Sequence, residues 1–310
     1  MTGSLQWVSG SPAVQAAVDA WRSDESRGGV LRDNPRRRLV RIPGGQEGPL
    51  LVKHHRGAEH HPLREALKRW IGRSPAAREA RYLQTLDSSG VPVPGLAGLA
   101  RLPDGGSLLI LRFLPGRAGV DGLPAGRAAR SSALASLGAA VRALHQSGHI
   151  HGDLHGENVL FEGESAVLLD VQHVRRSRRA ADRLRDLGEL DYSLWGRASA
   201  ADRLRLRRAA LGGSPTRELL RAVGEAARDK AHQHGRSRTR RLLRPGRLAV
   251  ALTTHDARGL RLREMPAEAV AEALRLHERA LRVGGSAVLK VDGRSSLTRV
   301  EAGGRRLVVK

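Results

Sequence analysis

The sequence predicts an α+β fold with two lobes, an antiparallel-sheet N-terminal lobe and a mainly helical C-terminal lobe, followed by a C-terminal helix plus β extension. Three observations indicate this fold. Apolar and polar residues alternate between residues 30 and 55, apolar residues recur at helical spacing between residues 134 and 194, and a helical pattern followed by strand patterns returns near the end. We expect residues 1–115, 116–245 and 246–310 to form the two lobes and the extension.

The N-terminal lobe is predicted to begin with a short helix and to continue as a three-stranded meander. Ser11 and Pro12 occupy positions typical of an N-cap and a first helical residue, so the segment AVQAAVDAW is expected to be helical. The segments VLRD, RRLVRI and PLLVKHH alternate apolar and polar residues and are separated by turn-forming residues. The last of these antiparallel strands ends near Lys53.

Two helices are predicted to follow the meander. Pro62 begins a basic helix, PLREALKRWIG, and the Ser-Pro pair at 74–75 begins a second helix, PAAREARYLQTL. On the second helix Glu79 lies three and four residues before Tyr82 and Leu83, so it shares their apolar face. The pattern therefore predicts a carboxylate that points inward.

The remaining elements complete both lobes. LAGLARL and SLLILRFL flank the turn PDGG and are typical of a hairpin that closes the N-terminal lobe. Beyond the LPG segment at 114–116, apolar residues at helical spacing predict a helix that ends at Gly148. Two short strands, VLF and AVLLD, come next, then a helix over residues 180–194 and a helical, basic segment over residues 198–245.

The stretch HIHGDLHGENVL, which begins at His149, is compatible with a metal site or with a phosphate site. On a straight strand its alternate polar residues, from His149 to His155, would share one face, but the outer pair would stand roughly 20 Å apart. One zinc ion could reach only neighbours in that row, and the two glycines of the stretch weaken a strand. A two-ligand metal site with His173 as a distant third ligand remains the alternative.

As a loop, the same stretch has the pattern H-x-D-x-x-x-x-N and precedes a strand that ends in an aspartate. Phosphoryl transfer needs a carboxylate that orients the attacking hydroxyl and a magnesium ion that screens the phosphates. Asp153 is the expected base, and His151 is expected to brace the loop. Asn158 and Asp170 offer the oxygen ligands that Mg²⁺ prefers.

Phosphoryl transfer from a nucleotide also needs a lysine for the phosphates and a glutamate that holds the lysine. Lys53 ends an apolar strand, and Glu79 is the inward-pointing carboxylate of the second helix. An inward charge is costly without a partner. We therefore expect Lys53 and Glu79 to pair.

With these motifs in this order, the chain resembles the lipopolysaccharide kinase (Kdo/WaaP) family, which has a protein-kinase-like fold. The resemblance covers about residues 30–195 and rests on LLVKHHRG, HPLREALKRWIGRSPAAREARYLQTLDSSGVPVPG, LRFLPG, HGDLHGENVL, VLLDVQHVRR and RLRDLGELDYSL. The form HGDLH is also similar to aminoglycoside and choline phosphotransferases. The basic helix that leads into SPAAREA and GVPVP favours the lipopolysaccharide kinases.

The resemblance implies a bilobal, ATP-dependent kinase that phosphorylates a hydroxyl, on a sugar of the lipopolysaccharide core or of another lipid-linked glycan. It implies ATP and Mg²⁺ as cofactors, with Asp153 as the catalytic base beside His151, Lys53 and Glu79 as nucleotide-binding residues, and Asn158 and Asp170 as metal ligands. Asp186 matches an acidic position of the family, but a cap or an ion pair within its own arginine-rich helix is the favoured interpretation.

Three departures from the kinase pattern leave other functions open. No G-x-G-x-x-G lies between the first strands, so an arginine of RDNPRRRLVRI or backbone amides would have to cover the phosphates. DVQ stands where protein kinases have DFG, and Gly152 replaces the arginine of HRD. The alternatives are a pseudokinase or scaffold, and a kinase that acts on protein or on a small molecule.

The formal net charge of +23 indicates an anionic partner or surface, such as nucleic acid, anionic lipid headgroups or a phosphorylated substrate. For any single arginine cluster, a solvated face is the equal alternative. Only 3% of the residues are aromatic, so stacking platforms for nucleic-acid bases are hard to assemble. We expect ATP, a glycan or glycolipid acceptor and an anionic membrane surface as partners, and no specific nucleic acid.

The chain contains no cysteine, which excludes disulfides and thiolate zinc sites and is typical of a reducing compartment. The N-terminal residues lack the pattern of a signal peptide, and no apolar run approaches the roughly 18 residues of a membrane span. We expect a cytoplasmic protein, or one that is peripheral at the inner face of the cytoplasmic membrane.

The C-terminal extension repeats the pattern of the N-terminus. Residues 266–310 and 12–53 both show a helix, a glycine pair and then strands that end at a lysine, so that Lys310 would correspond to Lys53. The hypothesis is that residues 246–310 begin a second, truncated kinase-like N-terminal lobe. A helix and hairpin that merely share the alternating pattern are the alternative.

Overall fold

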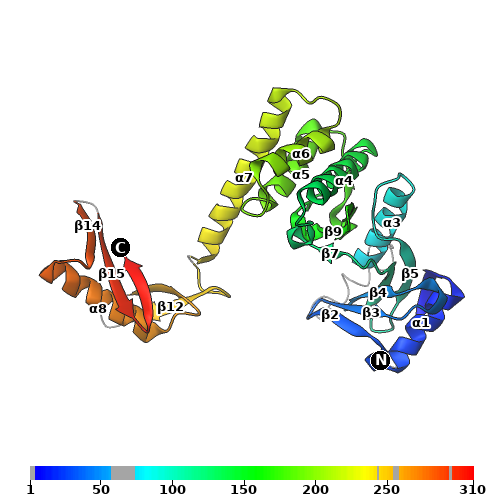
Figure 1. Ribbon diagram of the computed structural model, residues 1–310. Helices are drawn as coiled ribbons and strands as arrows, with labels where there is room; N and C mark the ends of the chain where they lie inside the picture. Colours follow the sequence, from blue (N-terminus) through cyan, green and yellow to red (C-terminus); the bar gives the residue numbers. More distant parts are fainter. Residues whose placement is uncertain (1–3, 57–73, 243, 254–257, 293–294) are drawn as a thin grey trace. The chain divides into compact units, whose positions relative to one another are not determined.

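The computed structural model describes residues 4–56, 74–242, 244–253, 258–292 and 295–310 (Figure 1). The chain divides into two compact units, Met1–Lys230 and Ala231–Lys310. The basic helix predicted to begin at Pro62 lies outside the described residues.

The first unit begins with a six-stranded antiparallel sheet in the order β1-β5-β6-β4-β3-β2. Its strands are β1 (Gln6–Gly10), β2 (Gly29–Asn34), β3 (Arg37–Ile42), β4 (Leu50–His55), β5 (Leu96–Arg101) and β6 (Ser107–Arg112). The predicted meander is confirmed as β2-β3-β4, and the predicted hairpin as β5-β6. Strand β1, which extends the sheet beside β5, is an addition that the sequence analysis missed.

Serine caps start the two described helices of this lobe. In α1 (Pro12–Ser23) the Ser11 hydroxyl accepts the N–H of Val14 at 3.3 Å. In α3 (Pro75–Asp87) the Ser74 hydroxyl accepts the N–H of Ala77 at 3.1 Å. Each cap satisfies an otherwise unpaired amide and contributes about 1 kcal/mol. Both predicted helix starts are therefore confirmed.

The sheet separates two hydrophobic cores because strand side chains alternate between its faces. On one face, Val18 and Trp21 of α1 pack in a core that includes Leu108 and Ile110 of β6. On the other face, the neighbouring Leu109 of β6 packs in a core that continues into the helical lobe. Strand β6 is buried on both sides, and the second core joins the lobes.

The C-terminal lobe is built around α4, which packs against α6 and against the hairpin β9-β10. Its elements are β7 (Arg117–Ala118), α4 (Arg127–Gln146), β8 (His149–Ile150), β9 (Val159–Glu162), β10 (Ser165–Leu168), β11 (Arg175–Arg176), α5 (Ala180–Ser193), α6 (Ala200–Leu211) and α7 (Arg217–Leu242). The predicted strands and helices of this lobe are confirmed. The predicted α+β fold with a sheet lobe and a helical lobe is confirmed as well.

A buried ionic cluster fixes α5 against α6. Asp191 of α5 is fully buried, and its two carboxylate oxygens accept hydrogen bonds from Arg207 at 2.9 and 2.8 Å. Arg203 contacts the same carboxylate at 3.2 Å. Bidentate arginine–carboxylate contacts are strong and directional. The cluster holds the helix that also carries Asp186.

The second unit contains the C-terminal part of α7, a hairpin and a helix on a three-stranded sheet. Its other elements are β12 (Ala249–Thr253), β13 (Arg258–Leu262), α8 (Ala267–Val283), β14 (Val288–Asp292), β15 (Ser295–Ala302) and β16 (Arg305–Val309). Ala273 of α8 packs on Val300 of the central strand β15, and His277 bonds the Thr298 hydroxyl at 2.8 Å. Within the described part of the chain, no helix has the length and apolar composition needed to cross a membrane.

Candidate active site

Lys53 and Glu79 form a buried ion pair between the sheet and a helix. Lys53 lies on β4 and Glu79 on α3, and only 7% and 1% of these residues are exposed. The Lys53 Nζ lies 2.5 Å from the Glu79 Oε1. Each charge would be costly to bury alone, so the ammonium of Lys53 and the carboxylate of Glu79 compensate each other's burial.

Asp170, from the C-terminal lobe, lies beside this pair. Its Oδ1 is 3.9 Å from the Lys53 Nζ and 3.3 Å from the Nη1 of Arg37, the first residue of β3. Burial alone would raise the pKa of Asp170, but the charges of Lys53 and Arg37 outweigh burial and hold that pKa below its ordinary value. Asp170 is therefore ionised at neutral pH and attracts cations.

His55 completes the surroundings of Glu79 without adding charge. Its Nε2 is 4.0 Å from the Glu79 Oε2. Burial, assisted by the positive charges of Lys53 and Arg37, lowers the pKa of His55 to about 4. The imidazole is therefore neutral at pH 7, so His55 does not compete with the Lys53 ammonium for the carboxylate of Glu79.

The backbone at Asp170 is held in a strained conformation. Its φ of 55° and ψ of 53° are left-handed, and among the described residues no other non-glycine has a positive φ. This conformation costs about 1–2 kcal/mol. The preceding Leu169 is fixed on both sides, since its N–H donates to the Asn158 carbonyl at 2.8 Å and its carbonyl accepts from the His151 Nε2 at 2.9 Å. His151 thus connects the loop to the residue before Asp170.

Asp186 fastens the same loop from α5. One carboxylate oxygen accepts the N–H of His151 and the other accepts the N–H of Gly152, both at 2.9 Å. His145 of α4 contacts the carboxylate at 3.1 Å. The favoured interpretation from sequence, a cap or an arginine pair within α5, is wrong, because the partners of Asp186 are the amides of the loop and a histidine.

Gly152 has no room for a side chain. Its φ is 78°, and a Cβ placed on it would lie 2.7 Å from the backbone oxygen of His173. Contacts under 3.0 Å are essentially never made by a Cβ, so every other residue would displace the backbone here. Glycine at the position of the HRD arginine is therefore a steric requirement of this loop.

Asp153 follows Gly152 and is accessible. Its side chain is 44% exposed, and the His155 Nε2 lies 3.8 Å from its Oδ2. Only the backbone oxygen of Asp153 is tied down, by the Asn158 side-chain amide at 2.9 Å. The carboxylate is thus free to meet a substrate.

Asn158 and Asp170 offer oxygen ligands that fit Mg²⁺. The Asn158 side-chain nitrogen donates to the Asp153 carbonyl, which leaves the Oδ1 as the atom of Asn158 that can act as an oxygen ligand. Mg²⁺ commonly uses one or two protein oxygens together with nucleotide phosphates and water. The donor set fits a nucleotide-bound magnesium ion.

A metal site with three ligands is not formed by the histidines of this stretch in the described ranges. They contain no group of three or more histidine, aspartate and glutamate residues placed to hold a metal ion. His151, the central histidine of the stretch, uses its Nε2 on the Leu169 carbonyl. The geometry therefore favours the phosphate interpretation of the loop.

The structure brings Lys53, Glu79 and Asp170 together, as predicted, and adds Arg37. The sequence offered little to distinguish Arg37 from its neighbours in RDNPRRRLVRI. The strand register identifies it, because Leu39 pairs with Lys53 and Arg37 pairs with His55. Residues two apart on a strand share a face, so Arg37 lies on the same side of the sheet as Lys53.

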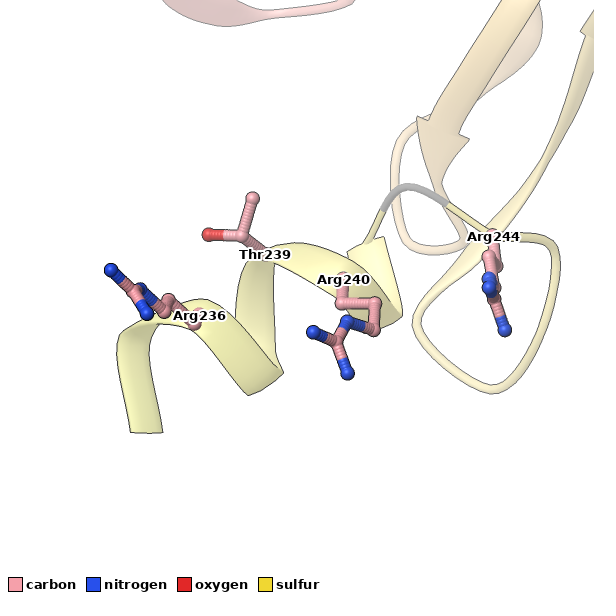
Figure 2. Close-up of a pocket in the computed structure, with 4 residues that line it drawn as sticks. All are labelled: Arg236, Thr239, Arg240 and Arg244. Carbon is pink, nitrogen blue, oxygen red and sulfur yellow. The ribbon is translucent and has the colours of Figure 1, made fainter. Parts of the chain in front are cut away.

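An arginine-lined pocket lies in the second unit and contains none of the predicted site residues. Arg236, Thr239, Arg240 and Arg244 line it (Figure 2). Arg236 and Arg240 are one helical turn apart near the end of α7, where the side chains of residues 232–240 are exposed. The pocket is a cationic surface feature.

The description "Lipopolysaccharide kinase (Kdo/WaaP) family" belongs to the family model that matches residues 22–209 of this chain. One curated protein, the "Probable bifunctional tRNA threonylcarbamoyladenosine biosynthesis protein" of Methanothermobacter thermautotrophicus, is 34% identical over 122 residues. The match covers 39% of this chain, and the chain spans about a fifth (21%) of the length of that relative.

The solved structures that match this chain include two phosphotransferases and a choline/ethanolamine kinase family protein, each with a TM-score under 0.5. An aminoglycoside-3'-phosphotransferase of type VIII has a TM-score of 0.47 at 17% identity and covers 69% of this chain and 97% of its own. The macrolide 2'-phosphotransferase MphH from Brachybacterium faecium has a TM-score of 0.44 at 17% identity, with coverages of 74% and 96%. A choline/ethanolamine kinase family protein from Mesorhizobium loti has a TM-score of 0.44 at 19% identity, with coverages of 74% and 94%.

Proposed function

We propose that this chain, which belongs to the lipopolysaccharide kinase (Kdo/WaaP) family, is a kinase that transfers the γ-phosphate of ATP to a hydroxyl of a lipid-linked sugar, such as a sugar of the lipopolysaccharide core. The observation that carries the proposal is the approach of Lys53 to Asp170, at 3.9 Å, from opposite lobes. An amine and an ionised carboxylate at that distance form a site for nucleotide phosphates and their cation.

The chain's own residues divide the work of the transfer. Lys53, positioned by Glu79, would bind the ATP phosphates, and Asp153 would accept the proton of the acceptor hydroxyl as it attacks. Asn158 and Asp170 would hold Mg²⁺, which when bound screens the negative charge of the phosphates. Asp186 accepts the N–H of His151 in the loop, and the His151 Nε2 bonds the carbonyl of Leu169, the residue before Asp170. These two contacts would hold the loop and Asp170 in fixed positions relative to each other.

The acceptor can be tested by transfer of labelled phosphate from ATP. We expect the full chain to label a glycolipid fraction of a bacterial membrane extract, and the Asp153→Asn variant to leave that fraction unlabelled. Label that enters only a protein pool or a small-molecule pool would overturn the sugar acceptor while leaving the kinase. Absence of transfer to any pool by the wild type would favour the scaffold alternative.

The arginines at the end of α7 support a contact with an anionic membrane surface. Arg236, Arg240 and Arg244 line one pocket (Figure 2), and the side chains of residues 232–240 are exposed. An electrostatic contact with anionic lipid is worth about 1 kcal/mol per arginine. A peripheral location beside a lipid-linked acceptor follows from such a contact.

We expect the triple variant Arg236→Gln, Arg240→Gln, Arg244→Gln to bind phosphatidylglycerol-containing vesicles about a hundredfold more weakly than the wild type. Cosedimentation measures the affinity, with pure phosphatidylcholine vesicles as the baseline. The charge-matched control changes three exposed arginines on separate elements, Arg258, Arg279 and Arg306, and should lose much less. Equal losses in both variants would mean that net charge alone acts, and RNA binding without vesicle binding would rule out the membrane.

Residues 246–310 are proposed to begin a second kinase-like N-terminal lobe. Three features support this: α8 is followed by Gly284 and Gly285, three antiparallel strands come next in the order β14-β15-β16, and the helix packs on the middle strand. In the first unit α1 likewise packs on Val40 of β3, the middle strand of β2-β3-β4. The boundary between the compact units falls at 230/231, inside α7.

A further inference from the structure

The turn between β2 and β3 joins the two strands that continue the sheet beyond β4, the strand of Lys53. ATP phosphates bound at Lys53 would need groups on this side of the site that bind them. A glycine-rich loop would supply free backbone amides, which form an anion-binding concavity. Here the side-chain oxygen of Asn34 accepts the N–H groups of Arg36 and Arg37 at 3.0 and 2.9 Å. Pro35 has no N–H to donate. Residues 35–37 therefore have no amide left for a phosphate.

The turn is also held in place by Arg56, the residue that follows β4. The Arg56 guanidinium donates to the Asn34 carbonyl at 2.8 Å and to the Asp33 carboxylate at 2.7 Å. Proline at one central position and these two bonds restrict the turn, so its amides cannot easily be released. The sequence allowed two kinds of group to bind the phosphates in place of a glycine-rich loop, an arginine side chain or backbone amides. With the amides of this turn occupied, the arginine remains.

Arg37 is the arginine that reaches the site. Its side chain is 19% exposed, and the Asp170 Oδ1 is its one hydrogen-bonding partner within the described structure. Lys53 already has Glu79 at 2.5 Å, whereas the Arg37 Nη1 lies 3.3 Å from the Asp170 Oδ1, closer than the Lys53 Nζ at 3.9 Å. A guanidinium is also well suited to phosphate, since its planar fork binds two oxygens at once.

We propose that Arg37 replaces the glycine-rich loop as the group that binds the terminal phosphates of a nucleoside triphosphate, and that its contact with Asp170 is the nucleotide-free arrangement. In this arrangement Arg37 occupies an oxygen that a metal ion would use. Nucleotide binding then moves Arg37 from the carboxylate to the phosphates and releases Asp170. The inference rests on the proposed function, because it assumes that ATP binds between Lys53 and Asp170.

Nucleotide titrations of the full chain test the phosphate role. We expect Arg37→Gln to weaken ATP binding about tenfold to a hundredfold, the usual range for a lost hydrogen bond to a charged group, and to change AMP binding little. The ATP affinity of Arg37→Lys should lie between those of the wild type and Arg37→Gln, since lysine keeps the positive charge but lacks the planar guanidinium that binds two oxygens at once. The control Arg81→Ala removes an exposed arginine of α3 and should match the wild type.

Manganese binding without nucleotide tests the exchange of partners. Removal of the arginine frees the Asp170 carboxylate, so Arg37→Gln should bind Mn²⁺ more tightly than the wild type while it binds ATP more weakly. Opposite signs are the signature of the proposal, since a merely structural residue would weaken both. Electron paramagnetic resonance of free Mn²⁺ gives the affinity, and thermal unfolding confirms that each variant is folded.

The outcomes separate this inference from the proposed function. If the wild type binds ATP and Arg37→Gln binds it equally well, the role of Arg37 is refuted and the kinase site stands. If Mn²⁺ and ATP affinities fall together in Arg37→Gln, the arginine is structural and the exchange is refuted. If the wild type binds no ATP, the proposed site itself fails.

Discussion

Replacement of Asp153 by asparagine lowers the rate of phosphoryl transfer by about 10²- to 10⁴-fold and leaves ATP binding nearly unchanged. An amide has almost the same shape as the carboxylate but cannot accept the proton of the acceptor hydroxyl. The Asp153 side chain is 44% exposed, and the His155 Nε2 lies 3.8 Å from it, beyond hydrogen-bond distance, so the substitution breaks no structural bond. Steady-state transfer to the acceptor gives the rate, and a nucleotide titration gives the affinity.

Glu157→Gln is the matched control for Asp153→Asn. It removes an exposed carboxylate from the same loop, four residues away, and should retain the activity of the wild type. Transfer by Asp153→Asn at the rate of the wild type would contradict the base role. A large loss of ATP affinity in that variant would instead place Asp153 at the nucleotide.

Replacement of Glu79 by glutamine destabilises the protein by about 3–5 kcal/mol, because the buried Lys53 ammonium loses the charge that compensates it. The same change weakens ATP binding, since Lys53 is then drawn toward Asp170. Urea denaturation measures the free energy of unfolding, and the midpoint should fall without a change of slope.

The double variant Lys53→Met, Glu79→Leu separates stability from function. Replacement of both charges by apolar groups of similar volume removes the buried pair without leaving one charge alone, so stability should return close to that of the wild type. Phosphoryl transfer should remain absent, because no amine binds the phosphates. A stable Glu79→Gln variant, or an active double variant, would show that the pair is dispensable.

The sequence predicts elements whose signals are local. Ser11 and Ser74 mark helix starts because the hydroxyl of an N-cap serine accepts a hydrogen bond from the backbone N–H three residues later, so the signal lies within a few residues of sequence. The strands of the meander were predicted because their side chains alternate with period two. The family was predicted from the order of several such signals, and the family model confirms it.

Features that depend on long-range contacts were missed or misinterpreted. Strand β1 pairs with β5, about ninety residues away, and its short sequence shows no clear alternation. Asp186 was assigned to its own helix because nothing in the sequence shows that α5 faces the loop amides. Arg37 could be separated from its neighbouring arginines only by the register that places it beside His55.

The steric limit at Gly152 restricts how this kinase can be controlled. In protein kinases an arginine at this position can hold a phosphorylated activation segment. Here the His173 carbonyl occupies the space that the first side-chain atom would need. A single substitution of Gly152 by arginine would therefore displace the backbone of the loop before it could install such a switch.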